Sequence, residues 1–307
     1  FKQKTAYEIM PSLVGSEMCI RDSFFITSVK IDACGMVPSR REGKILSQYN
    51  EASSKPTTWP NGAGLALSIV VNVEEGAEQS IRDGDSRPEP IDELGVVLRK
   101  PLRNYANESN YRYGIKAGAP RVLALLKSRS VPATFTCAAL SLERSPELAA
   151  EIIGNGHEVC AHGLRWTHQH RMNESEERSF IDATSQSILE TCGERPLGWL
   201  SRYLITDNTR RLLADAGFVY HMDDYSDDQP FWDTTGDKSI LVLPYALDTN
   251  DMKMWTAPSY SPSDWLRYAI DTFDWLYAES AQHLRMMSLG VHPVSYTHLT
   301  LPTILLV

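Results

Sequence analysis

The segment 131–162 constrains the fold most, because it predicts a strand, a helix and a second strand in succession. Residues 131–137 are rich in β-branched and aromatic side chains, and Ser145 followed by a proline is a typical helix start. Residues 157–161 form a short apolar run, and His162 comes directly after it. In parallel α/β proteins the functional groups gather at the C-terminal ends of the strands. The sequence therefore places His162 where a catalytic or metal-binding side chain is expected.

The rest of the chain continues this alternation. Residues 65–73 are an almost continuous apolar run, typical of a strand buried on both faces. Further strands are expected near 199 and over 218–221, 240–244 and 286–291, and helices over 118–128, 145–155, 173–193, 207–216 and 263–279. Such alternation implies a mainly parallel sheet. Polar clusters follow at least six of the strands. A barrel would gather these clusters at one mouth, so we predict an α/β fold of the (β/α) barrel type, with a doubly wound sheet as the alternative.

Composition narrows the classes of function. The formal net charge of −9 and the lack of a basic stripe argue against nucleic acid and anionic membranes as partners. No apolar run approaches the roughly 18 residues of a membrane span. The central cysteines, at positions 137, 160 and 192, form no Cys-x-x-Cys pair, which favours buried thiols in a reducing compartment. We expect a cytoplasmic protein with a small-molecule substrate, and a homo-oligomer is left open.

The two ends of the chain differ from the rest. Residues 1–23 and 293–307 resemble translated sequencing-library adapters, and we set them apart from the fold. Residues 24–57 are polar and are expected to form an N-terminal arm, and residues 58–292 are expected to form the catalytic barrel, cut short at its C-terminal end. We expect the adapter-like ends to pack poorly against the barrel.

Seven segments in order along the chain share one resemblance. They are Trp59 to Ala63, Val71 to Glu78, Gly156 to Trp166, Arg195 to Trp199, Asp223 to Trp232, Pro244 to Met252 and Ser288 to His292. Together they resemble the polysaccharide deacetylase (NodB-homology) family, and within it the branch of allantoinase-like and cyclic imide hydrolases. The resemblance implies a distorted (β/α) barrel with about seven strands. It also implies a hydrolase of carbon–nitrogen bonds other than peptide bonds.

The chain departs from the family at the positions of the metal ligands. Glu74 and Glu75 occupy the place of the family's paired aspartates, one a base and the other a metal ligand. The family's second motif is His-x-x-x-His, and here His162 is present but Trp166 stands four residues later. The divalent-metal site is therefore incomplete, with Glu75 and His162 as the ligands if any metal binds. No cofactor is expected, although a divalent metal such as zinc stays open, with His168 or His170 as a substitute ligand.

Hydrolysis of an amide needs a base to activate water, stabilisation of the oxyanion and a proton for the leaving nitrogen. We expect Glu74, Glu75, His162 and His292 to be catalytic and to line one pocket, with His292 as the general acid. Substrate-binding roles are expected for Arg165, Trp166, Arg202, Asp223, Asp248 and Asn250.

Three functions remain possible at this point. Without a metal to polarise the carbonyl, an ordinary acetamide is a hard substrate, whereas a cyclic imide or ureide has weaker amide resonance and a better leaving nitrogen. We therefore favour the opening of a small cyclic amide or ureide similar to allantoin or an imide. The alternatives are a metal-dependent N-deacetylase of a polysaccharide or peptidoglycan, and a non-catalytic binding module with a decayed site.

Overall fold

The strand β2 (Leu65–Val73) is the centre of the molecule, because it pairs with three other strands and is buried along nearly its whole length. The computed structural model describes residues 24–26, 59, 62–90, 97–98, 100–234 and 236–295. One edge of β2 pairs in parallel with β9 (Arg285–Val291), from Leu65 opposite Arg285 to Val71 opposite Val291. β2 also pairs in parallel with β1 (Phe24–Ile26) at its start and with β3 (Thr134–Cys137) at its end.

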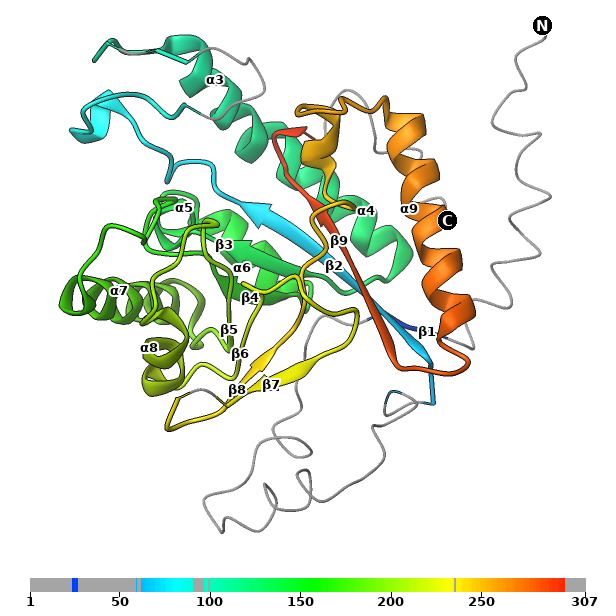
Figure 1. Cartoon of the computed structure of the whole chain (residues 1–307). Coiled ribbons are helices and arrows are strands. Elements are labelled where there is room, and N and C mark those ends of the chain that lie inside the picture. Colours follow the sequence, from blue (N-terminus) through cyan, green and yellow to red (C-terminus); the bar gives the residue numbers. More distant parts are fainter. Residues whose placement is uncertain are drawn as a thin grey trace, which may run out of the picture.

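Beyond β3 the sheet continues in parallel through β4, β5, β6 and β8, and β7 joins β8 in the antiparallel direction. These strands are β4 (Glu158–Ala161), β5 (Gly198–Trp199), β6 (Tyr220–His221), β7 (Phe231–Asp233) and β8 (Ile240–Val242). The strands curve around a common centre (Figure 1), so their C-terminal ends meet on one side. This is the distorted (β/α) barrel that the sequence predicts.

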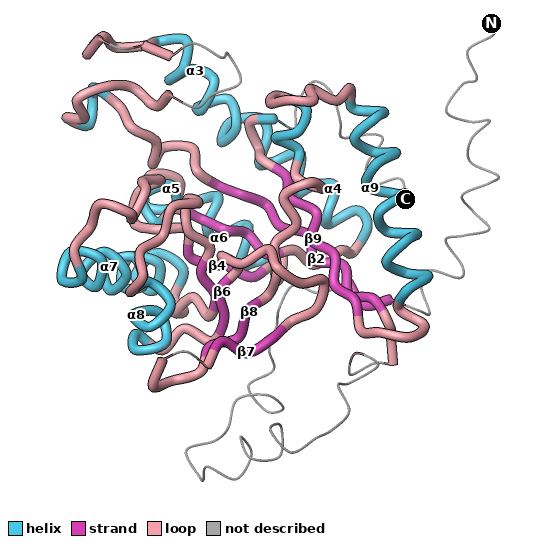
Figure 2. The backbone as a smooth tube through the Cα atoms, in the orientation of Figure 1, coloured by secondary structure: helices cyan, strands magenta, loops and turns pink. Residues whose placement is uncertain are grey.

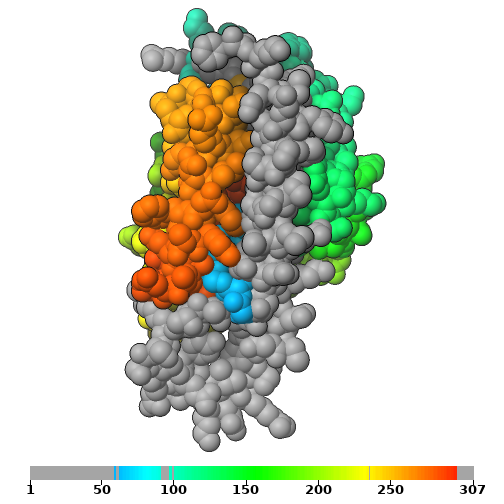
Figure 3. Space-filling model, turned by 90° about the vertical axis from the view of Figure 1, so that its right-hand side faces the viewer, coloured from blue at the N-terminus to red at the C-terminus, as the bar shows by residue number. Residues whose placement is uncertain are grey.

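Helices surround the strands on the outside (Figure 2). They are α3 (Tyr105–Tyr113), α4 (Ala119–Arg129), α5 (Ala139–Glu143), α6 (Pro146–Gly154), α7 (Glu174–Cys192), α8 (Thr209–Ala216) and α9 (Pro262–Glu279), with the short turns η1 (Ile81–Asp83), η2 (Gly114–Gly118) and η3 (Asp251–Met254). Figure 3 shows α9, in orange, on the outer surface. The apolar sides of these helices pack in a core with Phe135 of β3 and Trp199 of β5, and α9 contributes Trp265; all three side chains are fully buried. No helix among these described segments has the length and apolar character needed to cross a membrane.

The elements expected from the sequence are present, with small shifts at their ends, and the capping box at Asn173 and Glu176 is confirmed. Four further elements were not expected: β1, α3, α5 and β7. The helix α3 lies in a stretch that reads as a polar connection. It forms because Asn104 caps its first turn and Tyr111 buries its ring on one side of the helix.

A seam closes the barrel between β8 and β9, where no regular strand pairing is formed by the described residues. We define the seam as residues 246–251 against residues 288–290 of β9. Ala246 N donates to Ser288 Oγ (2.6 Å), Thr249 Oγ1 donates to Ser288 O (2.6 Å), and Gly290 N donates to Thr249 O (3.2 Å). The polypeptide after β8 therefore takes the place of a last strand.

Most of the two adapter-like ends lies outside the described residues. The exceptions are residues 293–295. Val294 N donates to a carboxylate oxygen of Glu75 (3.0 Å), and Ser295 Oγ accepts a hydrogen bond from Trp255 Nε1 (3.0 Å). Poor packing is therefore not found at Val294 and Ser295.

Candidate active site

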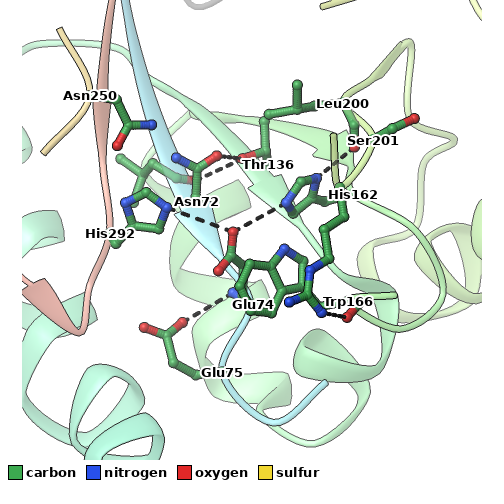
Figure 4. A network of polar contacts seen from close by, with 12 residues as sticks. Asn72, Glu74, Glu75, Thr136, His162, Trp166, Leu200, Ser201, Asn250 and His292 are labelled. Atoms are coloured by element: carbon green, nitrogen blue, oxygen red, sulfur yellow. Dashed lines mark hydrogen bonds and ion pairs between the residues drawn. The ribbon is translucent and has the colours of Figure 1, made fainter. Parts of the chain in front are cut away.

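Glu74 is the first residue after β2, and it lies at the centre of the site. Its side chain is almost completely buried. Its Oε1 atom lies 3.2 Å from Nε2 of His162 and 3.7 Å from Nε2 of His292. Dashed lines in Figure 4 mark both contacts. The carboxylate is therefore held between two imidazole rings, each from a different strand end.

His162 follows β4 and is oriented by the backbone of the next strand. Its Nδ1 atom donates a hydrogen bond to the carbonyl oxygen of Leu200 (2.5 Å). A carbonyl oxygen can only accept, so Nδ1 carries a proton, and Nε2 faces Glu74. The ring is thus fixed at both nitrogen atoms before any substrate binds.

His292 follows β9 and is fixed by Asp251. The backbone N of His292 donates to Asp251 Oδ2 (2.8 Å), and its Nδ1 donates to Asp251 Oδ1 (2.6 Å). Asp251 is almost fully buried, so this pair is shielded from water and its attraction is strong. The arrangement leaves Nε2 of His292 directed toward Glu74.

The charges of these groups stabilise one another. Burial by itself lowers the pKa of His292, but the charge of Asp251 and the hydrogen bonds to Asp251 and Glu74 outweigh it and raise the pKa well above its usual range. Burial by itself raises the pKa of Glu74, but the hydrogen bonds and charges of His162 and His292 lower it to about 2. At neutral pH the site therefore holds an ionised carboxylate beside a protonated imidazole.

A polar network lies beside Glu74 on the side of β9. Asn72 Oδ1 accepts a hydrogen bond from Thr136 Oγ1 (2.5 Å), and Asn72 Nδ2 donates to the hydroxyl of Tyr245 (3.1 Å). Asn250 Nδ2 donates to the same hydroxyl (2.8 Å). Three elements, β2, β3 and the segment after β8, are therefore linked around the hydroxyl of Tyr245.

The opposite side of the site is formed by Trp166 and Arg202. The guanidinium carbon of Arg202 lies 3.6 Å from the centre of the Trp166 ring, and Nη1 of Arg202 donates to the carbonyl oxygen of Trp166 (2.7 Å). The same guanidinium makes a bidentate ion pair with the Glu89 carboxylate (2.6 and 2.9 Å), and both side chains are buried. The cation is held rigidly against the aromatic ring.

Most of these groups line a single pocket with a cavity volume of about 30 Å³. This volume is well below the range for small-molecule sites, about 300–1,000 Å³. Half-exposed aromatic rings of Tyr203 and Tyr225 stand at the mouth. The lining residues are Asn72, Glu74, His162, Trp166, Leu200, Ser201, Arg202, Tyr203, Tyr225, Tyr245, Leu247, Asn250 and His292.

Comparison with known proteins identifies the family of this chain. A family profile described as polysaccharide deacetylase matches residues 110–221. A Schizosaccharomyces pombe protein named "Putative polysaccharide deacetylase" is 33% identical over an alignment of 258 residues, and the match covers 76% of this chain and 80% of that protein. This chain belongs to the polysaccharide deacetylase family.

Solved structures agree with this family membership. A probable polysaccharide deacetylase from Pseudomonas aeruginosa PAO1 is 36% identical with a TM-score of 0.74, covering 83% of this chain and 86% of that one. The Puue allantoinase is 37% identical with a TM-score of 0.75, covering 84% of this chain and 86% of that one. The predicted family, fold and reaction class are confirmed: the chain is a hydrolase of carbon–nitrogen bonds.

Polysaccharide deacetylases commonly depend on a metal. The side chains of this site can therefore be compared with the ligands that such a metal requires. A catalytic zinc ion takes three protein ligands and a water. Among the residues that the structure describes, no group of three or more His, Cys, Asp or Glu side chains could hold a metal ion. The place of the second histidine is taken by Trp166, against which the Arg202 cation lies. The donor set does not fit a divalent metal.

Glu75 is a correction to the expected set, because it does not line the pocket with Glu74, His162 and His292. One of its carboxylate oxygens accepts from the backbone N of Glu74 (3.1 Å) and the other from that of Val294 (3.0 Å). Figure 4 shows its side chain directed away from the two histidines. The pairing of Glu75 with His162 as metal ligands is not found, and His168 and His170 also lie outside the pocket lining.

Trp166, Arg202 and Asn250 line the pocket as expected, but three other candidates for substrate binding do not. Arg165 is bound by Asp85 (2.6 and 3.0 Å). Asp248 accepts a hydrogen bond from Tyr268 OH (2.6 Å) on the outer side of the barrel.

The third is Asp223, which accepts from the backbone N of Ser201 (2.8 Å) behind the pocket wall. For Arg165 and Asp248, local partners hold the polar group away from the cavity, whereas Oδ2 of Asp223 is buried without a hydrogen-bond partner among the described residues.

Sequence reasoning missed Asp251, Tyr245 and Asn72. Asn72 had a detectable signal, because it is an amide inside an otherwise apolar strand and must find polar partners. Asp251 stands in the polar cluster after β8, where it is one of three neighbouring candidates and nothing in the sequence distinguishes it. Tyr245 had no signal beyond its position after a strand.

Proposed function

We propose that this chain opens a small cyclic amide or ureide by hydrolysis of a ring carbon–nitrogen bond, with protein side chains in place of a divalent metal. The observation that carries the proposal is the stack of Arg202 on Trp166, which puts a fixed cation where a metal-dependent deacetylase needs a ligand. A cyclic imide or ureide needs the least help from a Lewis acid, because its leaving nitrogen is stabilised by a second carbonyl. The likeness to an allantoinase supports the same substrate class.

In the proposed reaction each polar group of the site acts on the substrate's carbonyl carbon or its ring nitrogen. Glu74 accepts a proton from a water molecule, whose oxygen forms the new bond to the carbonyl carbon. As the carbon–nitrogen bond breaks, its electron pair goes to the ring nitrogen, which takes the proton from Nε2 of His292. Asp251 holds His292 in its protonated form, and His162 fixes the position of the carboxylate. The products are a carboxylic acid and the freed N–H group in one opened chain.

The low pKa of Glu74, about 2, would make it a weak base if nothing changed during the reaction. It is low because His162 and His292 donate toward the carboxylate. When His292 directs its proton to the substrate nitrogen, Glu74 loses one of these stabilising contacts and becomes more basic. Proton delivery and water activation are therefore coupled through one imidazole ring.

The experiment that tests this proposal is a hydrolysis screen with and without a chelator. The substrates are hydantoins, cyclic imides, ureides and N-acetylated sugars. We expect ring opening of at least one cyclic compound, at a rate that chelator leaves unchanged. Acetate release from N-acetylated sugars that requires added zinc would refute the proposal and favour a metal-dependent N-deacetylase. Failure to hydrolyse any amide, with ligand binding retained, would favour a binding module.

A further inference from the structure

Tyr245 stands next to the catalytic groups but has no place in the proton transfers described above. Its ring is almost completely buried, and it lines the pocket together with Glu74 and His292. It follows β8 at the start of the segment that closes the barrel against β9. The position of its hydroxyl proton decides what it can do.

Both lone pairs of the Tyr245 hydroxyl are already used. Asn250 Nδ2 donates to it (2.8 Å), and the orientation of that amide is fixed because Asn250 Oδ1 accepts from the backbone N of Met252 (2.8 Å). Asn72 Nδ2 donates to it as well (3.1 Å). The orientation of the Asn72 amide is supported by Thr136 Oγ1, which donates to Asn72 Oδ1 (2.5 Å).

A hydroxyl that accepts two hydrogen bonds must direct its own proton elsewhere. No acceptor for the Tyr245 proton is found within the described ranges 62–90 and 100–234 or between 236 and 295. Burial raises the pKa of Tyr245 to about 12, so the proton stays on the oxygen at neutral pH. Donation by two amides to the same oxygen also strengthens the hydroxyl as a donor. The site therefore holds one oriented hydrogen-bond donor without a protein partner.

The chain keeps space for this hydroxyl at Gly290 of β9. A Cβ atom added to Gly290 would lie 2.2 Å from the Tyr245 oxygen and 2.9 Å from Asn250 Nδ2. Any residue larger than glycine would displace both groups. The close approach of the β9 backbone is thus part of what sets the position of the hydroxyl.

We propose that Tyr245 donates its hydrogen bond to the substrate's carbonyl oxygen and stabilises the negative charge that forms there when water attacks. This rests on the proposed function only in requiring an amide carbonyl, whether cyclic or acyclic. The proton remains on Tyr245 throughout, so no bond of the tyrosine is made or broken. In a site whose donor set does not fit a metal, this hydroxyl supplies the stabilisation that a Lewis acid would supply.

The test is Tyr245→Phe, which removes the hydroxyl and keeps the ring. It is measured on whichever amide the wild-type protein hydrolyses in the screen above. We expect kcat to fall by about 10²–10³, the usual effect of losing one donor to an oxyanion, with KM changed only a few-fold. A phosphonate analogue of the tetrahedral intermediate should lose affinity by a similar factor. A matched control is Tyr220→Phe, because Tyr220 is equally buried but donates to Glu158 (2.9 Å), away from the pocket.

A second variant keeps the test valid if Tyr245→Phe does not fold. Gly290→Ala leaves the tyrosine in place and displaces its hydroxyl, and we expect the same loss in kcat. Gly154→Ala is its control, since a Cβ atom there meets nothing within 4 Å. A folded Tyr245→Phe variant with kcat within three-fold of wild type and undiminished analogue binding overturns the proposal, as does an equal fall in kcat for Tyr220→Phe. A wild type that cleaves only N-acetylated sugars refutes the cyclic substrate but leaves this test of Tyr245 intact.

Discussion

Replacement of Asp251 by asparagine tests the reaction scheme most directly. Asp251 is buried and accepts two hydrogen bonds from His292, one from the backbone and one from Nδ1. Asparagine has nearly the same shape but carries no charge. The substitution therefore removes the largest influence that raises the pKa of His292, and the amide nitrogen can no longer accept one of the two hydrogen bonds from His292.

The magnitude follows from the hydrogen bond that loses its charge. A hydrogen bond to a charged group contributes about 1.5–3 kcal/mol. With about 1.4 kcal/mol for each factor of ten, kcat should fall by roughly 10- to 150-fold where His292 has lost its proton. The loss of kcat depends on pH. The raised pKa of His292 keeps the acid protonated until the pH rises through it, and lowering that pKa removes the acid from the alkaline side first.

The assay is a profile of kcat against pH for wild type and Asp251→Asn. We expect the alkaline limb to move to lower pH and the two curves to approach each other in acid. Asp248→Asn is the matched control, because Asp248 lies three residues away in the same loop but bonds Tyr268 outside the pocket. Equal loss of kcat at every pH, or no loss at all, would refute the role of Asp251 in holding the proton of His292.

Three further outcomes are expected. Glu74→Gln should lower kcat by about 10²–10⁴. The pKa of Glu74 is lowered to about 2, so its contribution to stability should be complete above the usual carboxyl pKa and should be lost as the pH falls from there toward about 2. The free energy of unfolding should therefore fall more steeply with acid for wild type than for the variant. Identical acid titrations would contradict this. Burial raises the pKa of Asp223 to about 6, so Asp223→Asn should raise Tm at neutral pH but not in acid; a gain that does not depend on pH would speak against it. Gly198→Ala should destabilise by roughly 1–3 kcal/mol in denaturant titration, because its Cβ would lie 1.9 Å from Tyr220; an unchanged midpoint would mean that the ring can move aside.

The fold could be predicted from the sequence because its strands and helices carry strong local signals. The apolar run of β2 and the capping box of α7 are examples, and both are found where expected. The helix α3 could not be predicted, since its polar sequence becomes helical only when Tyr111 has a core to pack against. Tertiary contacts supply what local propensity lacks there.

The site was predictable only in part, and Glu74 and Glu75 show why. Two adjacent glutamates follow a strand, and the sequence does not say which one faces the mouth. Alternation of side chains along a strand could have decided it from Asn72, whose amide must lie on the polar side. Glu74 lies on that same side, two residues on, whereas Val73 belongs to the hydrophobic core. The partner of His292 could not be read in the same way, because it depends on a loop conformation.

The seam that closes the barrel has a consequence for when the enzyme is chemically competent. Asp251 lies on one side of it, with Tyr245 directly before that segment, and Gly290 of β9 and His292, which follows β9, lie on the other. Only a few backbone and side-chain hydrogen bonds join the two sides. If the two sides of the seam separated, His292 would lose the Asp251 carboxylate that keeps it charged. Tyr245 would lose the Asn72 amide and the contact with Gly290 that orient its hydroxyl. The general acid His292 and the hydrogen-bond donor Tyr245 are therefore in place only when the barrel is closed. A local opening at the seam would remove both functions together.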